Sequence, residues 1–439
     1  MDERTLTYAK ELARLIQTPT TVLSDTVYFE KFHEVLWEIF PNIKAQTEIK
    51  KIFGNALLIK WKGKTDKNPL MLMGHQDGAP VNEEGWDVPP FSGEIKDGKI
   101  WGRGAIDDKN TVYLSLKAID ELIGEGFVPE TDVYFASSDN EEAAGEGTPH
   151  ILEYLQENGI KPAIVIDEGG AVVTDIFSMV KKPVAAIGII EKGFGVYKFT
   201  AKSHGGHTTT PPKNTPFERL SAFITDISKH NYFKPKMTKE VVAMISGISG
   251  ATNGIVSFVL KHIKLLKPII TPILPKLDPF FKALLSTTIT FTMAGGSELP
   301  NVIPNEAYVV ANTRYASHFT VADGEKLFKK LAKKHDIEFE NIMARDATPV
   351  VDINSESYKF VENCVKQVYK DCAVIPYVVF GATDCRYMFN VSPCALRFTP
   401  FRLSSEQMSK MHADNENVDA SALPEGVDFF KLLISTYKG

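Results

Sequence analysis

The feature that most constrains this chain is a set of three apolar runs in its first 170 residues, each of which ends in acidic or imidazole side chains. PLMLMGHQD ends at His75 and Asp77, VYFASSDNEE at Glu141 and Glu142, and AIVIDEGG at Asp167. Short apolar runs are typical of strands buried in a parallel sheet, which carries its functional groups at the carboxyl ends of its strands. The pattern therefore predicts an α/β fold in which these side chains meet at one sheet edge and form a metal site.

Length and composition narrow the class of protein. A chain of 439 residues exceeds the usual size of one core, so two domains are expected. A hydrophobic content of 44% and a charged content of 24% are ordinary for a soluble globular protein. The formal net charge of −6 argues against nucleic acid as the main partner, because phosphate binding needs a basic surface. The cysteines form no CxxC pair, and we expect buried free thiols at Cys364, Cys372, Cys385 and Cys394.

The sequence contains no clear membrane span or secretory signal. The first residues, MDERTLTYAKELARLIQTPTT, form an amphipathic helical pattern without a basic start and apolar core, which favours a cytoplasmic location. The most apolar stretch, residues 254–285, is interrupted by lysines and prolines, so it lacks the ~20 consecutive apolar residues of a membrane helix. We expect short packed helices there. The alternative is a partly exposed apolar surface that meets a lipid-like substrate, a membrane face or another subunit.

The hydrophobic pattern changes twice along the chain. Up to about Gly193, short apolar runs alternate with amphipathic helices, which is the signature of an α/β domain. Residues 194–344 instead show strands with one polar face, such as VYKFTAKS, and helical patterns that include an extra apolar segment near 231–290. The α/β pattern then resumes. We therefore expect a catalytic, metal-binding domain of residues 1–193 and 345–439, interrupted by an inserted α+β domain of residues 194–344.

Five side chains of the α/β regions have the chemistry of zinc ligands, which are His75, Asp107, Glu142, Asp167 and His412. A catalytic zinc site uses about three protein ligands and keeps one position open, so five ligands suit two ions that share a bridging carboxylate. Asp107 is the natural bridge because it precedes a helix amino terminus. Singly, each residue has an ordinary explanation as a structural histidine, a solvated acid or a turn residue. Their joint placement favours a metal centre, and no glycine-rich phosphate loop suggests a nucleotide.

Ten motifs, in order over nearly the whole chain, resemble the dinuclear zinc aminoacylase and carboxypeptidase family. They are MGHQDGAPV, GWDVPPFSG, WGRGAIDDK, SSDNEEAAG, IDEGG, SHGGHTTTPP, GGSELPNVIPNEA, NTRY, FGATDCRY and MHADNENV. The family includes glutamate carboxypeptidase, succinyl-diaminopimelate desuccinylase, aminoacylase and carboxypeptidase S. The Gly-Trp segment and the long apolar insertion most resemble the carboxypeptidase S and N-acyl-amino-acid hydrolase branch. The resemblance implies a zinc-exopeptidase-like domain with a central mixed sheet, and an inserted lid or dimerisation domain.

The same resemblance assigns roles to the candidate residues. The five ligand candidates would hold two Zn²⁺ ions, with cobalt or manganese as alternatives, and Asp107 would bridge them. Glu141 would be the general base, and Asp77 would be a catalytic residue that hydrogen-bonds the far nitrogen of His75. The peptide bond between Asp107 and Asp108 would be cis.

Further residues are expected to contact the substrate. Either imidazole of SHGGHTTTPP, His204 or His207, could stabilise the oxyanion, and the resemblance selects His207. It implies that Asn301 and Arg314 hold the substrate from the inserted domain. It also implies that a threonine and a planar guanidinium, Thr383 and Arg386, receive the free carboxylate. A surface ion pair is the alternative explanation for each arginine.

Together these features predict a metal-dependent amidohydrolase of the carboxypeptidase or aminoacylase type. We expect it to cleave the amide bond of an N-acyl amino acid or the C-terminal peptide bond of a short peptide, by zinc-activated water and a glutamate base. A dipeptidase that requires a free amino group, and a catalytically silent binding protein on the same scaffold, are the alternatives. The partner is a small molecule or short peptide with a free carboxylate, and a homodimer through the inserted domain stays open.

Overall fold

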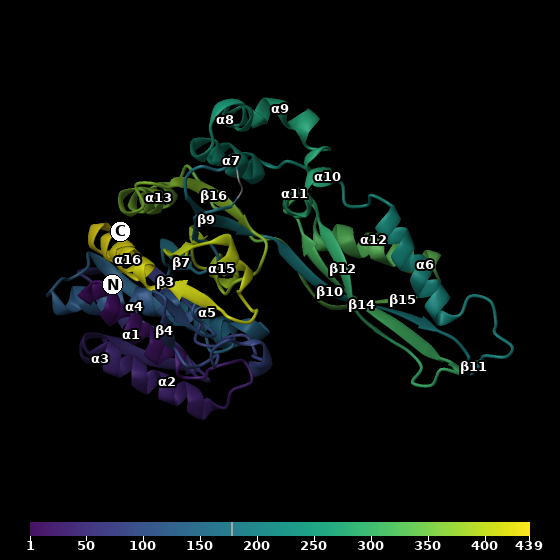
Figure 1. The fold of residues 1–439 in the computed structure, drawn as a ribbon, viewed down its shortest axis with the longest axis horizontal. Helices are drawn as coiled ribbons and strands as arrows, with labels where there is room; N and C mark the ends of the chain where they lie inside the picture. The colour runs from purple at the N-terminus through teal and green to yellow at the C-terminus, as the bar shows by residue number, and fades with distance from the viewer. Residues whose placement is uncertain (177–178) are drawn as a thin grey trace.

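The computed structural model describes residues 1–176 and 179–439, which form two large sheets with their own helices (Figure 1), and two small sheets. Within the described residues the larger sheet has ten strands, in the spatial order β1 (Glu48–Phe53), β2 (Ala56–Trp61), β6 (Thr131–Ser137), β3 (Thr65–Met73), β7 (Ile164–Asp167), β17 (Ala395–Arg397), β9 (Val184–Glu191), β8 (Val172–Val173) and β18 (Arg402–Leu403), with β16 (Ala373–Val379) also paired to β9. The strands β6, β3 and β7 run parallel, whereas β1 and β2 are antiparallel. The structure confirms the predicted α/β fold with a central mixed sheet.

Both faces of the larger sheet are buried. Successive side chains of a strand point to opposite faces, and on β3 both sets are part of an apolar core. Leu70 and Leu72 of β3 belong to one apolar core, whereas Met71 and Met73 belong to another. The first core is closed by α1 (Glu3–Ile16), α4 (Lys109–Gly124), α13 (Glu356–Val368) and α16 (Leu423–Thr436). The second is closed by α5 (Gly147–Glu157) and α14 (Cys385–Met388). The four cysteines are free thiols, and all except the half-buried Cys372 are buried, as predicted.

Smaller elements complete this part of the molecule. The helices α2 (Thr26–Ile39) and α3 (Pro41–Gln46) follow α1, and α15 (Ser405–Ser409) follows β18. A short separate sheet consists of β19 (Asn417–Asp419), β5 (Lys99–Trp101) and β4 (Glu94–Lys96). Its strands lie immediately before the Asp107 segment and after the His412 segment, so they bring two distant stretches of sequence together.

The second sheet is antiparallel and has its own core (Figure 1). Its spatial order is β12 (Thr288–Gly295), β14 (Glu306–Tyr315), β10 (Gly193–Lys202) and β15 (Glu338–Arg345). The helices α6 (Pro216–Lys229) and α12 (Val321–Lys334) pack on it, and Phe199, Phe223 and Phe328 lie at the centre of this core. A short pair, β11 (Gly206–His207) with β13 (Val302–Ile303), lies at the far end of the sheet from the larger domain.

The apolar segment forms five short helices: α7 (Lys239–Ile248), α8 (Gly254–Lys261), α9 (Ile263–Ile270), α10 (Leu274–Leu277) and α11 (Pro279–Leu285). Among the described residues, no helix is long and apolar enough to cross a membrane, so the prediction of short helices is confirmed. Their packing is uneven, because α8, α9 and α10 keep large apolar side chains exposed, as the alternative interpretation expected. α7 packs against β16, and Val241, Met244 and Leu285 share the first core of the larger sheet. The segment therefore belongs by packing to the larger domain, although it lies inside residues 194–344 of the sequence.

Candidate metal centre

Two groups of side chains could each hold a metal ion, and they share Asp107. One group contains His75, Asp107 and Glu168, and the other contains Asp107, Glu142 and His412; within each group the ligand atoms lie within 4.8 Å of one another. The two oxygens of Asp107 face different imidazoles. Oδ1 lies 2.8 Å from Nε2 of His75, and Oδ2 lies 3.0 Å from Nε2 of His412. This is the geometry that a bridging carboxylate needs.

The fold brings these side chains together from distant parts of the sequence. His75 follows β3, Glu142 lies in the short 3₁₀ turn after β6, and Glu168 follows β7. These three strands are parallel neighbours, so their carboxyl ends lie at the same sheet edge. Asp107 precedes α4, and its peptide bond to Asp108 is cis, as the family resemblance predicts. His412 lies in the loop after α15, with a positive φ of 60°.

The structure brings Asp167 into neither group of described residues, and the neighbouring Glu168 belongs to one of them. Asp167 is the last residue of β7, and its Oδ2 accepts a hydrogen bond of 2.7 Å from the backbone N–H of Cys385. Neighbouring side chains at a strand end point to opposite sides, so Glu168 faces the metal groups while Asp167 faces α14. Glu168 also lines the adjoining cavity. The paired acids of IDEGG were visible in the sequence, but its apolar pattern did not decide between them.

The chemistry of these donors fits divalent cations. Imidazole nitrogen and carboxylate oxygen are the ligands that zinc uses in catalytic sites. Oε1 of Glu142 is buried and has no hydrogen-bond partner among the described residues, although an unsatisfied buried carboxylate oxygen is costly. Burial raises the pKa of Glu168 well above its usual value, and the nearby Asp107 and Asp108 carboxylates add to that effect. A bound cation would remove both penalties by neutralising the clustered acids.

Asp77 holds several members of the site in place. Its carboxylate is fully buried, and Oδ1 lies 3.3 Å from Nδ1 of His75, where its backbone carbonyl is also 3.0 Å away. The same carboxylate accepts hydrogen bonds of 3.1 Å from the backbone N–H groups of Glu141 and Glu142. Asp77 therefore fixes the ring of one ligand and the backbone of the adjacent acid pair, which is a wider role than the sequence suggested.

Glu141 lies beside the metal groups, in contact with an arginine. Its Oε1 is 3.3 Å from Nη1 of Arg386, and both side chains are largely buried. Burial raises the pKa of Glu141 well above its usual value, and the Asp384 carboxylate adds to this, whereas Arg386 opposes it. Nη1 of Arg386 also donates a 2.6 Å hydrogen bond to the carbonyl of Thr383. The hydroxyl of Thr383 donates to Oε1 of Glu191 at 2.7 Å, so these two predicted substrate residues form one cluster with Glu141.

The predicted residues of the second sheet lie apart from this cluster. His207 is exposed on β11, and β11 pairs with β13 so that Asn301, just before β13, lies close to it. Figure 1 places this strand pair at the end of the second sheet that is remote from β3 and β7. Arg314 lies at the opposite end of β14, where its guanidinium stacks 5.1 Å from the ring of Phe194. The structure therefore groups His207 with Asn301, and neither lines the cavity at the metal groups.

Two buried residues that the sequence analysis missed position the Asp107 turn. Oε1 of Glu416 accepts hydrogen bonds from the backbone N–H groups of Ile106 at 2.6 Å and Asp107 at 3.2 Å. Arg103 donates to Oε2 of Glu416 at 2.7 Å. Burial raises the pKa of Glu416 to about 6, and Arg103 opposes this change. Glu416 was present in the quoted motif MHADNENV. Its contact with a turn more than 300 residues earlier carries no local sequence signal.

A cavity of about 560 Å³ extends from the metal groups into an apolar chamber. Its polar end carries Asp107, Glu141, Glu142, Glu168 and His412. Its apolar walls come from α7, α11, β16 and the loops around α15, through Met244, Ile248, Phe280, Ile375, Tyr377, Val379, Leu403, Met408 and Met411. The only acidic residues that line it among those described are the four at the metal groups.

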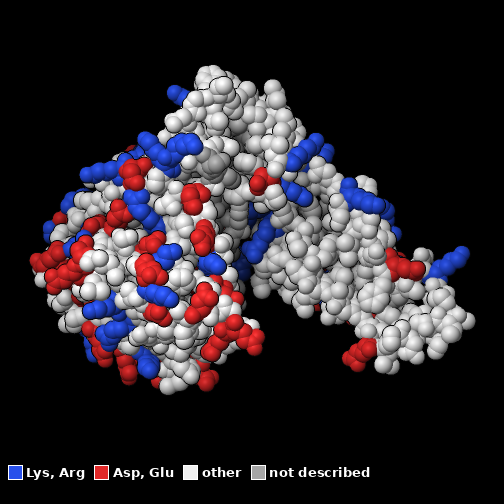
Figure 2. Space-filling view, viewed as in Figure 1, with Lys and Arg blue, Asp and Glu red and all other residues white. Residues whose placement is uncertain are grey.

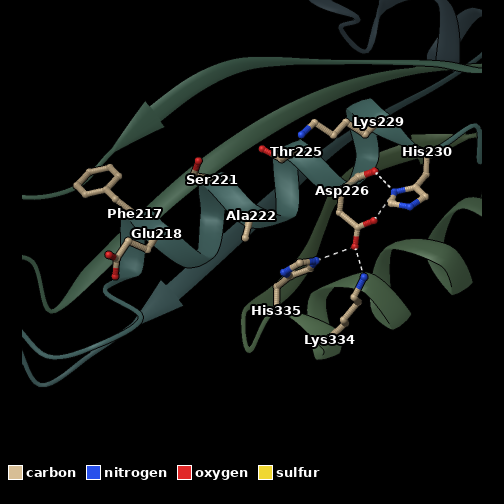
Figure 3. Close-up of a pocket in the computed structure, with 10 residues that line it drawn as sticks. All are labelled: Phe217, Glu218, Ser221, Ala222, Thr225, Asp226, Lys229, His230, Lys334 and His335. Atoms are coloured by element: carbon tan, nitrogen blue, oxygen red, sulfur yellow. Dashed lines mark hydrogen bonds and ion pairs between the residues drawn. The ribbon is translucent and has the colours of Figure 1, made fainter.

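A second hollow lies on the smaller domain, between α6 and α12 (Figure 3). At its centre the buried Asp226 accepts hydrogen bonds from Lys334 at 2.6 Å, His335 at 2.8 Å and Tyr232 at 2.9 Å. His230 lies on the other side of the carboxylate, 2.8 Å from Oδ1. The hydrogen bonds from Lys334, His335 and Tyr232, Lys334 first, lower the pKa of Asp226. The cluster joins two helices through satisfied contacts, so we interpret it as structural.

The chain matches the family model of peptidase family M20/M25/M40 over residues 71–436. The N-fatty-acyl-amino acid synthase/hydrolase PM20D1 of Xenopus tropicalis is 31% identical, over 95% of this chain and 83% of that protein. A probable carboxypeptidase S-like 2 of Dictyostelium discoideum is 29% identical, over 92% of this chain and 79% of that protein. Among solved structures, the M20 family metallo-carboxypeptidase Sso-CP2 of Sulfolobus solfataricus has a TM-score of 0.73 with 18% identity, over 100% of both chains. These findings confirm the family that the motifs predicted.

Proposed function

Because the chain belongs to the M20/M25/M40 peptidase family and is a hydrolase of that class, we propose that its substrate is an N-acyl amino acid with a long apolar acyl group. Hydrolysis of the amide would release a fatty acid and the free amino acid. The observation that carries this proposal is the cavity at the metal groups, which is polar at one end and apolar along the rest of its walls.

The cavity lining favours an aliphatic chain over a charged peptide terminus. Burial of an aliphatic chain stabilises binding by about 0.8 kcal/mol for each methylene group. A dipeptidase needs an acidic or carbonyl partner for the free amino group of its substrate, because a buried ammonium is costly without one. The described acids of the lining are those of the metal groups and the adjacent Glu141, and the distant walls are formed by Met244, Ile248 and Phe280.

The names of the relatives point to two classes of substrate, one of which is the proposed class. The Xenopus protein is named for fatty-acyl amino acids, and the Dictyostelium protein is named as carboxypeptidase S-like. Carboxypeptidase action on a short peptide with an apolar residue before the scissile bond is therefore the second candidate, since such a side chain could enter the same chamber. The two candidates differ in whether turnover depends on the length of an aliphatic chain.

We assign one metal site to His75, Asp107 and Glu168, and the other to Asp107, Glu142 and His412. This assignment replaces Asp167 with Glu168 and keeps Asp107 as the bridge. Zinc is the cation that this donor set suits, and cobalt or manganese would bind the same ligands. When bound, such ions lower the pKa of water from near 16 to about 7 and polarise the scissile carbonyl.

The residues around the metal groups divide the remaining work. Glu141 accepts the proton of the attacking water and passes it to the leaving nitrogen, as one positioned carboxylate can do both. Arg386 lies against Glu141 and beside Thr383, where its guanidinium can receive the free carboxylate of the amino acid. Asp77 keeps His75 and Glu141 in position through the hydrogen bonds described above.

We also propose that the second domain acts as a lid. His207 and Asn301 lie at its remote β11 and β13 pair, so they can reach the scissile bond only if the domains close or if a second copy supplies them. Closure around the substrate would exclude water and add an oxyanion donor.

A substrate panel tests the proposed function. Purified protein loaded with zinc should hydrolyse N-acyl amino acids with a kcat/KM that rises with the length of the acyl group. A chelator should abolish turnover. A dipeptide with a free amino group and a peptide with a polar residue before the scissile bond should be poor substrates. If a polar dipeptide were hydrolysed faster than every long-chain N-acyl amino acid, the proposal would be wrong.

A further inference from the structure

We propose that the outer surface of α8, α9 and α10 is a docking surface for an anionic phospholipid bilayer. We call this surface the apolar cap, and it consists of Ile255, Val256, Phe258, Leu265, Ile269, Ile273 and Leu277. Docking itself is independent of the hydrolytic function proposed above.

The apolar cap contains large side chains that water reaches. Its seven residues are between 36% and 83% exposed, with Ile255 and Leu265 at the upper end. Isolated apolar residues on a surface need no explanation, but a contiguous group marks an interaction site. Within α8, Ile255 and Phe258 are three residues apart and share a face, and Leu265 and Ile269 of α9 are four residues apart and share a face. The exposed side chains are therefore grouped by helix and are not scattered.

The charge around the apolar cap is positive, unlike that of the whole chain. Residues 254–285 contain Lys261, Lys264, Lys267, Lys276 and Lys282, with Asp278 as their only acidic residue. The complete chain has a formal net charge of −6. In Figure 2 the top of the molecule, over α8 and α9, is largely uncharged, and blue groups lie at its margins. Lysine stems can lie along the acyl boundary while their ammonium groups reach phosphates.

This combination favours an anionic bilayer over a second copy of the chain. In a two-fold symmetric dimer the same patch meets itself, so the lysines of one copy would face those of the other. An anionic membrane instead attracts each lysine near its surface and accepts the apolar side chains at the headgroup boundary. The helices are too short to span a membrane, which agrees with attachment at one face.

The position of the apolar cap links docking to the cavity. α8, α9 and α10 lie between α7 and α11 in the sequence, and α7 contacts both α8 and α9. α7 and α11 contribute Met244, Ile248 and Phe280 to the cavity wall. A docked protein would hold this wall next to the membrane, where amphiphilic acyl compounds are concentrated. This last step, unlike docking, rests on the proposed acyl substrate.

Vesicle binding tests the proposal with the whole 439-residue chain. Flotation should recover wild-type protein with vesicles of phosphatidylcholine containing about one third phosphatidylserine, and much less with phosphatidylcholine alone, because each lysine adds to the attraction. Added salt should weaken binding, since it screens that attraction. The triple variant Ile255→Ser, Phe258→Ser, Leu265→Ser should bind the anionic vesicles at least about tenfold more weakly.

A matched control removes equally exposed apolar groups elsewhere. Leu23, Val27 and Val128 are between 50% and 78% exposed and lie outside residues 254–285. The triple variant Leu23→Ser, Val27→Ser, Val128→Ser should bind vesicles like wild type. Equal thermal melting midpoints and equal turnover of a water-soluble N-acetyl substrate would show that both variants are folded. A variant set Lys261→Gln, Lys264→Gln, Lys267→Gln should lose the preference for anionic vesicles.

Two outcomes would overturn the proposal. One is wild-type protein that stays unbound to anionic vesicles at low salt. The other is a wild-type dimer in light scattering that the Ile255, Phe258 and Leu265 substitutions convert to a monomer, since the apolar cap would then be a self-interface. Neither outcome depends on amide hydrolysis, so failure of docking is distinguishable from failure of the proposed function.

Discussion

The apolar cavity makes a quantitative prediction about acyl chain length. Its walls are apolar beyond the metal groups, so each methylene group that enters should add about 0.8 kcal/mol of binding. This corresponds to a factor of about four in kcat/KM, because 1.36 kcal/mol is a factor of ten. Extension from N-acetyl to N-octanoyl adds six methylene groups, so the upper limit of the gain is about 3000-fold.

The substitution Ile248→Trp should flatten that dependence. Ile248 is half-buried at the carboxyl end of α7 and lines the cavity, so an indole ring there would occupy the space of the acyl chain. N-Acetyl hydrolysis should change by no more than about twofold, because the small acyl group stays near the metal groups. The gain for octanoyl should fall by at least about tenfold, which corresponds to the loss of two or more buried methylene groups.

Initial rates across an acyl series from C2 to C12, at substrate concentrations well below KM, give the required ratios. The matched control is Val242→Trp, because Val242 lies on the same helix and is partly buried against the core but does not line the cavity. Melting midpoints of both variants show whether the fold is retained. An unchanged slope in Ile248→Trp, or a wild-type rate that does not rise with chain length, would refute the reasoning.

Three further predictions concern other parts of the molecule. Glu141→Gln should keep its metal content and lose about 10²–10⁴-fold in kcat, because the amide cannot accept the proton of water. Glu142→Gln should instead lose metal. If Glu141→Gln lost metal and Glu142→Gln kept it, the two roles would be reversed. His207→Ala should lower kcat by about 10²–10³-fold at unchanged metal content, as expected for an oxyanion donor. If a partner subunit supplies the imidazole, a mixture of His207→Ala and Glu141→Gln proteins should regain activity. Near wild-type turnover of His207→Ala alone would remove this residue from the mechanism. Asp226→Asn should lower the unfolding free energy at pH 7 by about 1–3 kcal/mol. Lys334 and His335 lower the pKa of Asp226, so this stabilisation is present above the ordinary carboxyl pKa and is lost as the pH falls below it. The difference in unfolding free energy between variant and wild type, measured by chemical unfolding, should therefore shrink towards pH 3. A difference that stays constant with pH would contradict the ion cluster.

The sequence was informative where function depends on strand ends. The apolar runs before His75 and Glu142 identified parallel strands, and the rule for parallel sheets placed their ends at one edge. The lysines and prolines of residues 254–285 excluded a membrane helix and indicated short helices, which the structure contains. These inferences succeeded because each depends on a pattern that is local in the sequence.

The remaining features depend on contacts that no local pattern encodes. The choice between Asp167 and Glu168 depends on where β7 ends, since one residue of difference turns a side chain to the other face. Glu416 supports the Asp107 turn across more than 300 residues. The packing of α7 and α11 against the larger domain, and therefore the apolar chamber, required the tertiary structure.

The metal assignment is the central claim, and anomalous X-ray scattering at the zinc edge tests it most directly. Crystals of the zinc-loaded protein should show two peaks, one among His75, Asp107 and Glu168 and the other among Asp107, Glu142 and His412. In parallel, Glu168→Gln should lose zinc, while Asp167→Asn should retain most of it. A single peak, or a peak ligated by Asp167 in place of Glu168, would contradict the account.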